Sequence, residues 1–214
     1  AGTGTGKTLA YLLAAAMSGR KTIVATYTKA LQDQMVEFDL PMVARHIRSS
    51  TDRDFSFAVV KGWGNYLCLE RVDEIRSSRR QGQLDGMVEH ASGDEVDRVL
   101  AWAEDTSTGD RSDLDFDPAP STWSAVSTSS QECLGASDCP FAESCFPLKA
   151  RRHAAGADVT VANHALYAID LAIGGFALGE HGLVVLDEAH QVEQSFTEAF
   201  GFRLTGGRLR WLAN

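Results

Sequence analysis

The chain has 214 residues, of which 44% are hydrophobic and 23% charged, and its formal net charge is −9. This composition is typical of a soluble globular protein, and no apolar run approaches the roughly 20 residues that a membrane span needs. The acidic balance argues against indiscriminate binding to nucleic acids. Because the chain begins inside a motif that normally follows a buried strand, we interpret it as a fragment of a longer protein.

The first eight residues, AGTGTGKT, match the phosphate-binding loop of nucleotide-hydrolysing proteins. Glycines let the backbone N–H groups curl around a phosphate without clashes from Cβ atoms. The lysine of such a loop reaches the β- and γ-phosphates of ATP, and the hydroxyl that follows it binds Mg²⁺. We therefore expect a nucleotide site formed by Gly2, Thr3, Gly4, Thr5, Gly6, Lys7 and Thr8.

An amphipathic helix is expected directly after this loop. Apolar residues recur at helical spacing from Leu9 to Ala16, and Gly19 is a typical helix end. The positive end of this helix dipole would face the bound phosphates.

Three further segments, KTIVAT, FAVVKG and ADVTVAN, have the apolar pattern of buried strands, and each precedes a helical pattern. Alternating strands and helices predict an α/β fold with a parallel sheet and right-handed crossovers. The polar stretch ATYTKALQDQM runs from the end of the first of these strands into a helix, where its side chains could line a groove. Polar residues at such a position also serve as helix caps, so this signal is weak on its own.

The two motifs of the nucleotide site are too far apart in the sequence for an α/β lobe without an insertion. Lys7 and Asp187 are 180 positions apart, whereas one βαβ unit takes about 30 residues or somewhat more. The surplus lies between FAVVKG and ADVTVAN and contains every cysteine, which predicts an inserted subdomain. Within it, the acidic stretch EDTSTGDRSDLDFD is expected to form a solvated loop.

Three of the four cysteines are evenly spaced in QECLGASDCPFAESCF, at positions 133, 139 and 145, and the fourth is Cys68. Disulfides are disfavoured for an intracellular nucleotide-hydrolysing lobe, which sits in a reducing compartment. Buried apolar thiols are disfavoured because Cys133 and Cys139 lie among Gly, Ser and Asp. Metal binding remains, and the spacing leaves both an iron–sulfur cluster and a zinc ion open.

The segment GLVVLDEAH supplies the carboxylates that a nucleotide site needs. The apolar run from Leu183 to Leu186 predicts a strand covered on both faces, followed by Asp187 and Glu188 at the carboxyl edge of the sheet. Asp187 would hold Mg²⁺, and Glu188 would orient and deprotonate the attacking water. Taken alone, these acids could equally cap a helix, but their combination with the phosphate-binding loop favours nucleotide hydrolysis.

Seven stretches together resemble the DinG branch of the iron–sulfur DNA helicases, relatives of XPD in helicase superfamily 2. They are, in order, GTGTGKT, TYTKALQDQM, VVKGWGNYLCLER, TGDRSDL, ECLGASDCPFAESCFPLKAR, ADVTVANHALY and LVVLDEAH. The resemblance implies a [4Fe–4S] cluster bound by Cys68, Cys133, Cys139 and Cys145, with Cys68 contributed by a distant helix. It also implies that His190 couples hydrolysis to strand movement. It further implies contacts with single-stranded DNA from Thr26, Thr28, Lys29, Gln32, Asn163 and His164.

The resemblance covers nearly the whole chain but not the whole family architecture. The family's second motor lobe, with its arginine finger, and an upstream element that reads adenine have no counterpart in this sequence. We predict a RecA-like P-loop lobe with a parallel sheet, interrupted by a mostly helical iron–sulfur domain. The expected boundaries are residues 1–64 and 149–194 for the lobe, 65–148 for the insert and 195–214 for the start of a helical arch domain.

The predicted activity is that of an ATP-dependent 5′-to-3′ DNA helicase, catalysed through Lys7, Asp187, Glu188 and His190 with ATP, Mg²⁺ and the cluster as cofactors. Its partners would be single-stranded DNA and a forked duplex or DNA–RNA hybrid, and this fragment alone would be inactive. We expect a monomer in the cytoplasm, associated with the nucleoid rather than with a membrane. The alternative is a P-loop ATPase without helicase activity, in which zinc stabilises the insert for protein or nucleic-acid binding.

Overall fold

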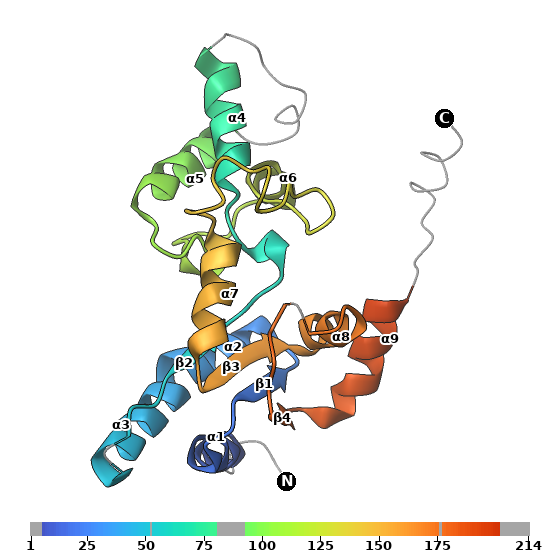
Figure 1. Ribbon diagram of the computed structural model, residues 1–214. Coiled ribbons are helices and arrows are strands. Elements are labelled where there is room, and N and C mark those ends of the chain that lie inside the picture. The colour runs from blue at the N-terminus through green and yellow to red at the C-terminus, as the bar shows by residue number, and fades with distance from the viewer. Residues whose placement is uncertain (1–5, 52, 81–92, 176, 202–214) are drawn as a thin grey trace. The chain divides into compact units, whose positions relative to one another are not determined.

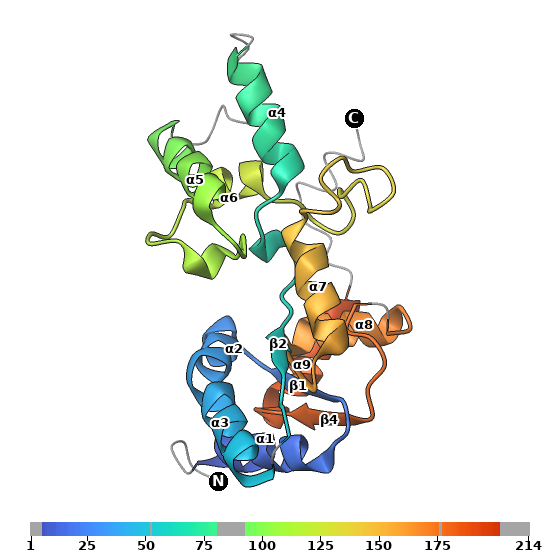
Figure 2. The same ribbon diagram turned by 60° about the vertical axis from the view of Figure 1, so that its left-hand side comes forward.

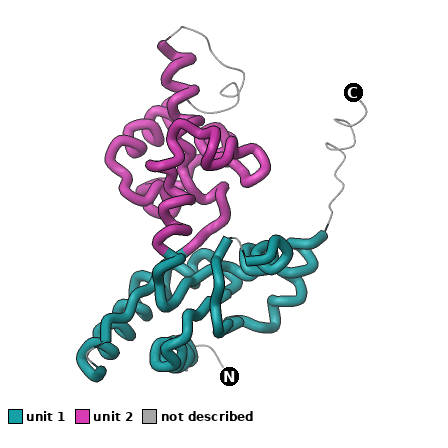
Figure 3. Tube along the Cα trace, in the orientation of Figure 1, with its two compact units in different colours: residues 1–59, 154–214 teal, residues 60–153 magenta. Residues whose placement is uncertain are grey.

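The computed structural model describes residues 6–51, 53–80, 93–175 and 177–201, and it divides into two compact units. Unit 1 comprises residues 1–59 and 154–214, and unit 2 comprises residues 60–153 (Figure 3). Each unit has its own core, a cluster of buried apolar side chains. None of the helices in the described ranges is long and apolar enough to cross a membrane.

Unit 1 is an α/β unit whose four-stranded sheet is entirely parallel, as the sequence predicts (Figure 1). The strands are ordered β2-β3-β1-β4 across the sheet. Their bounds are β1 Thr22–Thr26, β2 Phe57–Val59, β3 Val159–Asn163 and β4 Leu183–Leu186. In the register, Thr26 lies opposite Asn163, and Ala25 lies opposite Leu186. The carboxyl ends of β1, β3 and β4 therefore meet at one edge of the sheet.

Helices cover this sheet on both sides (Figure 2). Their bounds are α1 Lys7–Ser18, α2 Lys29–Gln34, α3 Leu40–Thr51, α8 His164–Ala172 and α9 Val192–Phe200, with a π-helical turn, η1, at Met35–Asp39 and a 3₁₀ turn, η4, at Ala189–Gln191. Helices α1 and α3 pack with β1 and β3 into one apolar core. Within that core, Leu12 of α1, Leu40 of α3 and Val24 of β1 are fully buried. The predicted helix after the phosphate-binding loop is confirmed, and it ends at Gly19, whose φ of 66° suits a residue without Cβ.

Strand β4 differs from its prediction. The sequence predicts a strand covered on both faces, but Leu183, Val184 and Val185 are only half-buried and Leu186 is 40% exposed. The reason is its position: β4 is an edge strand of the described sheet and pairs there with β1. An apolar run alone does not distinguish an edge strand from a central one.

Unit 2 is mainly helical in its described part. It contains the turns η2 Trp63–Asn65 and η3 Arg111–Asp113, the helices α4 Leu69–Arg80, α5 Gly93–Asp105 and α6 Pro120–Val126, and the first part of α7 Phe146–Gly156. Its core gathers Val96, Val99, Trp123 and Val126, among others. Two isolated antiparallel bridges, Tyr66 with Asp110 and Leu67 with Ser127, fasten the segment before α4 to the rest of the unit.

Candidate functional site

The described part of the phosphate-binding loop is its junction with α1. The predicted residues Gly2, Thr3, Gly4 and Thr5 lie outside the described residues. Gly6 stands directly before α1 with φ 70°, a left-handed conformation that glycine adopts without strain, and no side chain caps the helix there. Lys7 and Thr8 form the first turn of α1. The uncapped N–H groups of this turn are suited to bind an anion.

The predicted carboxylates follow β4 at the same edge of the sheet. The backbone N–H of Asp187 donates to the carbonyl of Ala25 at 2.9 Å, which extends the β1–β4 ladder by one residue. The Thr26 hydroxyl at the end of β1 donates to Asp187 Oδ2 at 3.3 Å. Asp187 is thus held by the neighbouring strand through both its backbone and its carboxylate.

Tyr11 of α1 interacts with residues of both parts of this site, the start of α1 and the segment after β4. It was not among the residues predicted from the sequence. Burial raises the pKa of the Tyr11 hydroxyl, and a hydrogen bond from Thr8 opposes the shift, while the charge and hydrogen bonding of Asp187 add to it. The hydroxyl therefore stays protonated at neutral pH, and it donates to Met35 Sδ at 3.9 Å. The available signal was spacing, because Tyr11 follows Thr8 by three positions and shares its helix face.

Glu188 has an unusual backbone conformation. Its φ of 50° and ψ of 46° make it the one non-glycine residue with positive φ in the described part of the chain. Such strain costs on the order of 1–3 kcal/mol and gathers at functional sites. Its Oε2 lies 3.3 Å from Nδ1 of His190, so these two predicted catalytic residues face each other. The sequence predicted both residues but not the strain.

Two of the residues expected to contact DNA act as helix caps. Thr28 accepts a hydrogen bond from the backbone N–H of Leu31 and caps α2, while Asn163 accepts one from Leu166 and caps α8. Thr28 and its neighbour Lys29 are exposed, and Asn163 is half-buried. The capping interpretation that the sequence left open for ATYTKALQDQM is therefore confirmed for Thr28, and the structure adds a cap at Asn163. Contact of these side chains with DNA stays a prediction.

Three other residues of that set are buried. Thr26 and Gln32 are 0% exposed and His164 is 1% exposed. His164 Nε2 lies 2.8 Å from the carbonyl oxygen of Asp187 and 3.1 Å from that of Ala25, so its ring ties the carboxylate segment to β1. Neither end of the Gln32 amide makes a hydrogen bond within the described structure. Direct contact of these side chains with DNA would require them to be uncovered.

All four cysteines line one open pocket in unit 2, with about 350 Å³ of empty space. Cys133 and Cys139 lie in an irregular segment between α6 and α7, as the sequence predicts. Cys68 and Cys145 stand directly before α4 and α7, and each carbonyl accepts from the N–H four residues on. Cys68 thus precedes its helix rather than lying within it. The remaining walls are largely apolar and include Trp63, Tyr66, Leu67, Leu69, Phe141 and Pro147.

The thiols are close enough to affect one another's pKa, and backbone N–H groups lie near several of them. Burial raises the pKa of Cys68, backbone N–H groups at the start of α4 oppose this shift, and Cys133 and Cys139 add to it. Burial likewise raises the pKa of Cys145, with the N–H of Leu148 opposing. The N–H of Gly135 lies 3.5 Å from Cys133 Sγ. Four thiols in one apolar pocket, three of them near backbone N–H donors, are a donor set suited to soft metals.

The sulfurs are nevertheless not gathered around one point. Among the described residues, no three His, Cys, Asp or Glu side chains converge closely enough to hold a metal ion. A single zinc ion would draw four sulfurs to within about 4 Å of one another, because each Zn–S bond is about 2.3 Å long. The pocket thus places four thiols side by side without the spacing of a tetrahedral zinc site.

The fold and geometry define an α/β protein with an open parallel sheet and polar side chains gathered at its carboxyl edge, where such proteins bind ligands. No known family profile matches the chain. It is 42% identical over 98% of its length to the ATP-dependent helicase DinG of Mycobacterium tuberculosis, and 37% identical over 100% to the ATP-dependent DNA helicase YoaA of Escherichia coli. It is also 27% identical over 94% of its length to the 3′-5′ exonuclease DinG of Bacillus subtilis.

The chain is similar to the DinG and YoaA helicases over nearly its whole length, which confirms the resemblance seen in the sequence. It spans 33% of the Mycobacterium tuberculosis relative, 32% of the Escherichia coli relative and 21% of the Bacillus subtilis relative. The matched region is therefore about one third of the two helicases' length.

Proposed function

We propose that this chain is the first, RecA-like motor lobe of an ATP-dependent DNA helicase that moves 5′ to 3′ along single-stranded DNA. The observation that carries the proposal is that Asp187, whose backbone N–H and carboxylate are both bonded to β1, is followed at the carboxyl edge of the sheet by Glu188 and His190, which face each other. The relatives' names support the activity, because those of Mycobacterium tuberculosis and Escherichia coli are called ATP-dependent helicases. The alternative, a zinc-stabilised ATPase without helicase activity, does not account for the relatives' names.

In this proposal the residues at the sheet edge bind and polarise ATP. Lys7, at the start of α1, binds the β- and γ-phosphates, and the N–H groups of the first helical turn, which no side chain caps, contribute further donors. Thr8 and Asp187 would hold Mg²⁺, which neutralises charge on the phosphates when bound. The hydroxyl of Tyr11 donates to Met35 Sδ at 3.9 Å, and both proposed ligands affect its pKa.

Glu188 then acts on the attacking water. Its backbone is strained, and Nδ1 of His190 lies 3.3 Å from its carboxylate. Glu188 accepts the proton of the water as this oxygen attacks the γ-phosphorus. His190 restrains the carboxylate and, being 67% exposed, is placed to respond to other parts of the helicase.

The insert, in this proposal, holds a [4Fe–4S] cluster through Cys68, Cys133, Cys139 and Cys145. The donor set fits, because each of the four irons of such a cluster takes one thiolate, and four thiols line the pocket. When bound, the cluster supplies a rigid cross-link among distant parts of unit 2. Iron and acid-labile sulfide in the anaerobically purified full-length protein test this assignment, and stoichiometric zinc without iron would favour the ATPase alternative.

Contact with single-stranded DNA is assigned to the exposed Thr28 and Lys29 and to Asn163. They lie at the ends of β1 and β3, near the same sheet edge as the nucleotide residues. In this proposal Thr26, Gln32 and His164 contribute after local rearrangement. The amide of Gln32 and Nδ1 of His164 make no hydrogen bond within the described structure.

Fork unwinding by the full-length protein tests the helicase assignment and its direction. The substrates are a duplex with a single-stranded 5′ tail and the same duplex with a 3′ tail, each with ATP and Mg²⁺. We expect unwinding of the first substrate alone. Unwinding from the 3′ tail would reverse the proposed direction, and ATP hydrolysis without unwinding of either substrate would favour the alternative ATPase.

A further inference from the structure

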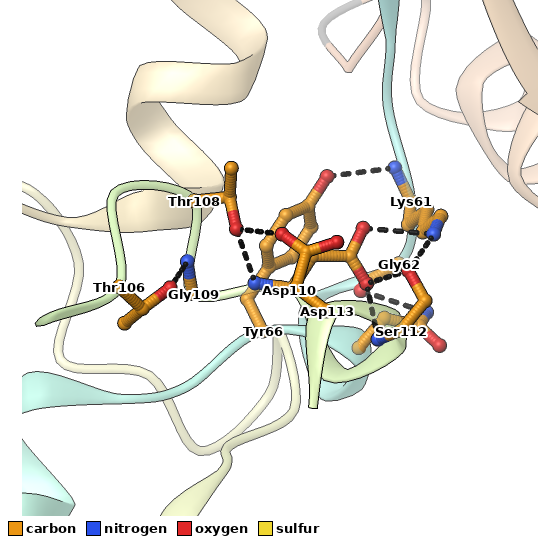
Figure 4. Close-up of polar contacts among 10 residues, drawn as sticks. Lys61, Gly62, Tyr66, Thr106, Thr108, Gly109, Asp110, Ser112 and Asp113 are labelled. Atoms are coloured by element: carbon orange, nitrogen blue, oxygen red, sulfur yellow. Dashed lines mark hydrogen bonds and ion pairs between the residues drawn. The ribbon is translucent and has the colours of Figure 1, made fainter. Parts of the chain in front are cut away.

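The acidic stretch at residues 104–117 contains a buried turn that the sequence does not predict. Most of its side chains are exposed, as expected for a solvated loop, but Gly109 and Asp110 at its centre are buried. The expectation of a solvated loop is therefore wrong at this point. The cause is a long-range ion pair: Lys61 Nζ lies 2.8 Å from Asp110 Oδ2, and the two side chains are 3% and 11% exposed (Figure 4).

The ion pair belongs to a closed set of hydrogen bonds. Lys61 Nζ also donates to Ser112 Oγ at 2.8 Å, and Ser112 donates to Asp110 Oδ1 through its N–H and its hydroxyl, both at 3.0 Å (Figure 4). The backbone N–H of Lys61 donates to the hydroxyl of Tyr66 at 3.1 Å. The two charges are therefore paired and hydrogen-bonded, which is the condition under which buried charges are tolerated.

The turn is bonded to the two residues that precede Cys68 in the chain. Tyr66 forms a bridge with Asp110, the N–H of Leu67 donates to the Gly109 carbonyl at 2.8 Å, and the N–H of Cys68 donates to the Val126 carbonyl at 2.8 Å. Tyr66, Leu67 and Cys68 all line the cysteine pocket. The backbone that carries the Cys68 thiol is thus fixed by the turn on one side and by the end of α6 on the other.

The same turn contacts the residue after Cys145. Gly109 has φ 62°, and a Cβ atom built on it would lie 2.8 Å from Phe146 Cε2 and closer still to two other atoms of that ring. The absence of a side chain at Gly109 therefore lets Phe146 lie against the turn. Because Phe146 begins α7, this packing fixes the helix start at which Cys145 stands.

We propose that Lys61, Asp110 and Ser112 are positioning residues that set the Cys68 and Cys145 thiols in place for the metal centre. The inference rests on the proposed cluster, but it concerns the residues that present the thiols rather than the thiols themselves. Mutation of residues that position metal ligands without binding the metal themselves changes the metal affinity by about 10- to 100-fold. The other two cysteines, in the segment between α6 and α7, do not depend on this turn.

The test is the rate at which the anaerobically purified full-length protein loses iron to a chelator. Asp110→Asn keeps the side-chain shape but removes the charge facing Lys61, so we expect iron loss to accelerate by about 10- to 100-fold. Ser112→Ala is a milder variant, for which the rate should lie between those of the parent and Asp110→Asn. Val99→Ala is the matched control, because Val99 is fully buried in the core of unit 2 and does not line the pocket.

The outcomes separate the positioning role from the cluster itself. Iron loss from Asp110→Asn that is no faster than from Val99→Ala would overturn the positioning role. A parent without iron and sulfide would instead refute the proposed cluster. In that case alkylation rates of the individual thiols decide: Asp110→Asn should speed alkylation of Cys68 and Cys145 relative to Cys133 and Cys139, and equal effects on all four would overturn the inference.

Discussion

Replacing Lys61 by methionine should destabilise unit 2 far more than breaking an exposed ion pair. Methionine preserves most of the apolar stem but leaves the carboxylate of Asp110, 11% exposed, without its cation. Removing one partner of a buried pair costs about 3–5 kcal/mol, and we expect about 3 kcal/mol because Ser112 still donates two hydrogen bonds to Asp110. With a urea m-value of about 1–3 kcal/mol per molar, the unfolding midpoint should fall by about 1–3 M.

The assay is urea unfolding followed by tryptophan fluorescence, to which Trp63, Trp102 and Trp123 of unit 2 contribute. Asp115→Asn is the control, because it breaks the Arg98–Asp115 pair, whose side chains are 55% and 86% exposed, and should cost about 0–1 kcal/mol.

A second variant separates the lost pair from the orphaned charge. Lys61→Met combined with Asp110→Leu removes both charges and should recover much of the stability lost by Lys61→Met alone. Equal midpoints for Lys61→Met and Asp115→Asn would refute the view that the Lys61–Asp110 pair holds this unit together.

Three further predictions concern the proposed sites in the full-length protein. Lys7→Ala should abolish ATP hydrolysis while circular dichroism stays that of the parent, because only a charge on the phosphates is lost; near-normal turnover would remove Lys7 from the site. Tyr11→Phe should weaken Mg–ATP binding by about tenfold in titration calorimetry, because the polar group that interacts with Thr8 and Asp187 is lost, and unchanged binding would restrict Tyr11 to packing. Cys139→Ser should bleach the brown chromophore and abolish fork unwinding while ATP binding survives, and a variant that unwinds normally would contradict the cluster's role.

The layout of unit 1 could be predicted from the sequence because it depends on local patterns. Short apolar runs followed by helical periodicity indicate a parallel sheet, and the helix from Lys7 to Ser18 follows from apolar spacing and a terminal glycine. The partial exposure of β4 could not be predicted in this way, since burial depends on which strand lies beside it. The second compact unit spans residues 60–153, whereas the predicted insert spans 65–148. Residues 202–214, most of the predicted start of an arch domain, lie outside the described residues.

The candidate site was predictable where a motif fixes the chemistry, as for Lys7, Asp187 and the cysteines. It was not predictable where distant residues meet. Lys61 and Asp110 lie in different segments, and the acidic surroundings of Asp110 suggested solvent rather than burial. The polarity of Gln32 and His164 was consistent with side chains exposed to bind DNA, but both side chains are buried. A polar side chain is expected to be exposed to solvent. Pairing of a charge with an opposite charge, or bonding of a ring to two carbonyls, allows it to be buried instead.

The most direct test of the central claim, that this sheet edge drives a DNA motor by hydrolysing ATP, is steady-state ATP hydrolysis by full-length protein with and without single-stranded DNA. We expect the DNA to stimulate hydrolysis by the parent. Glu188→Gln should bind ATP as tightly as the parent and hydrolyse it at least 100-fold more slowly, because the amide keeps the shape of the side chain but cannot accept the proton of the attacking water. Hydrolysis by Glu188→Gln at the parent rate, or a parent rate indifferent to DNA, would contradict the account.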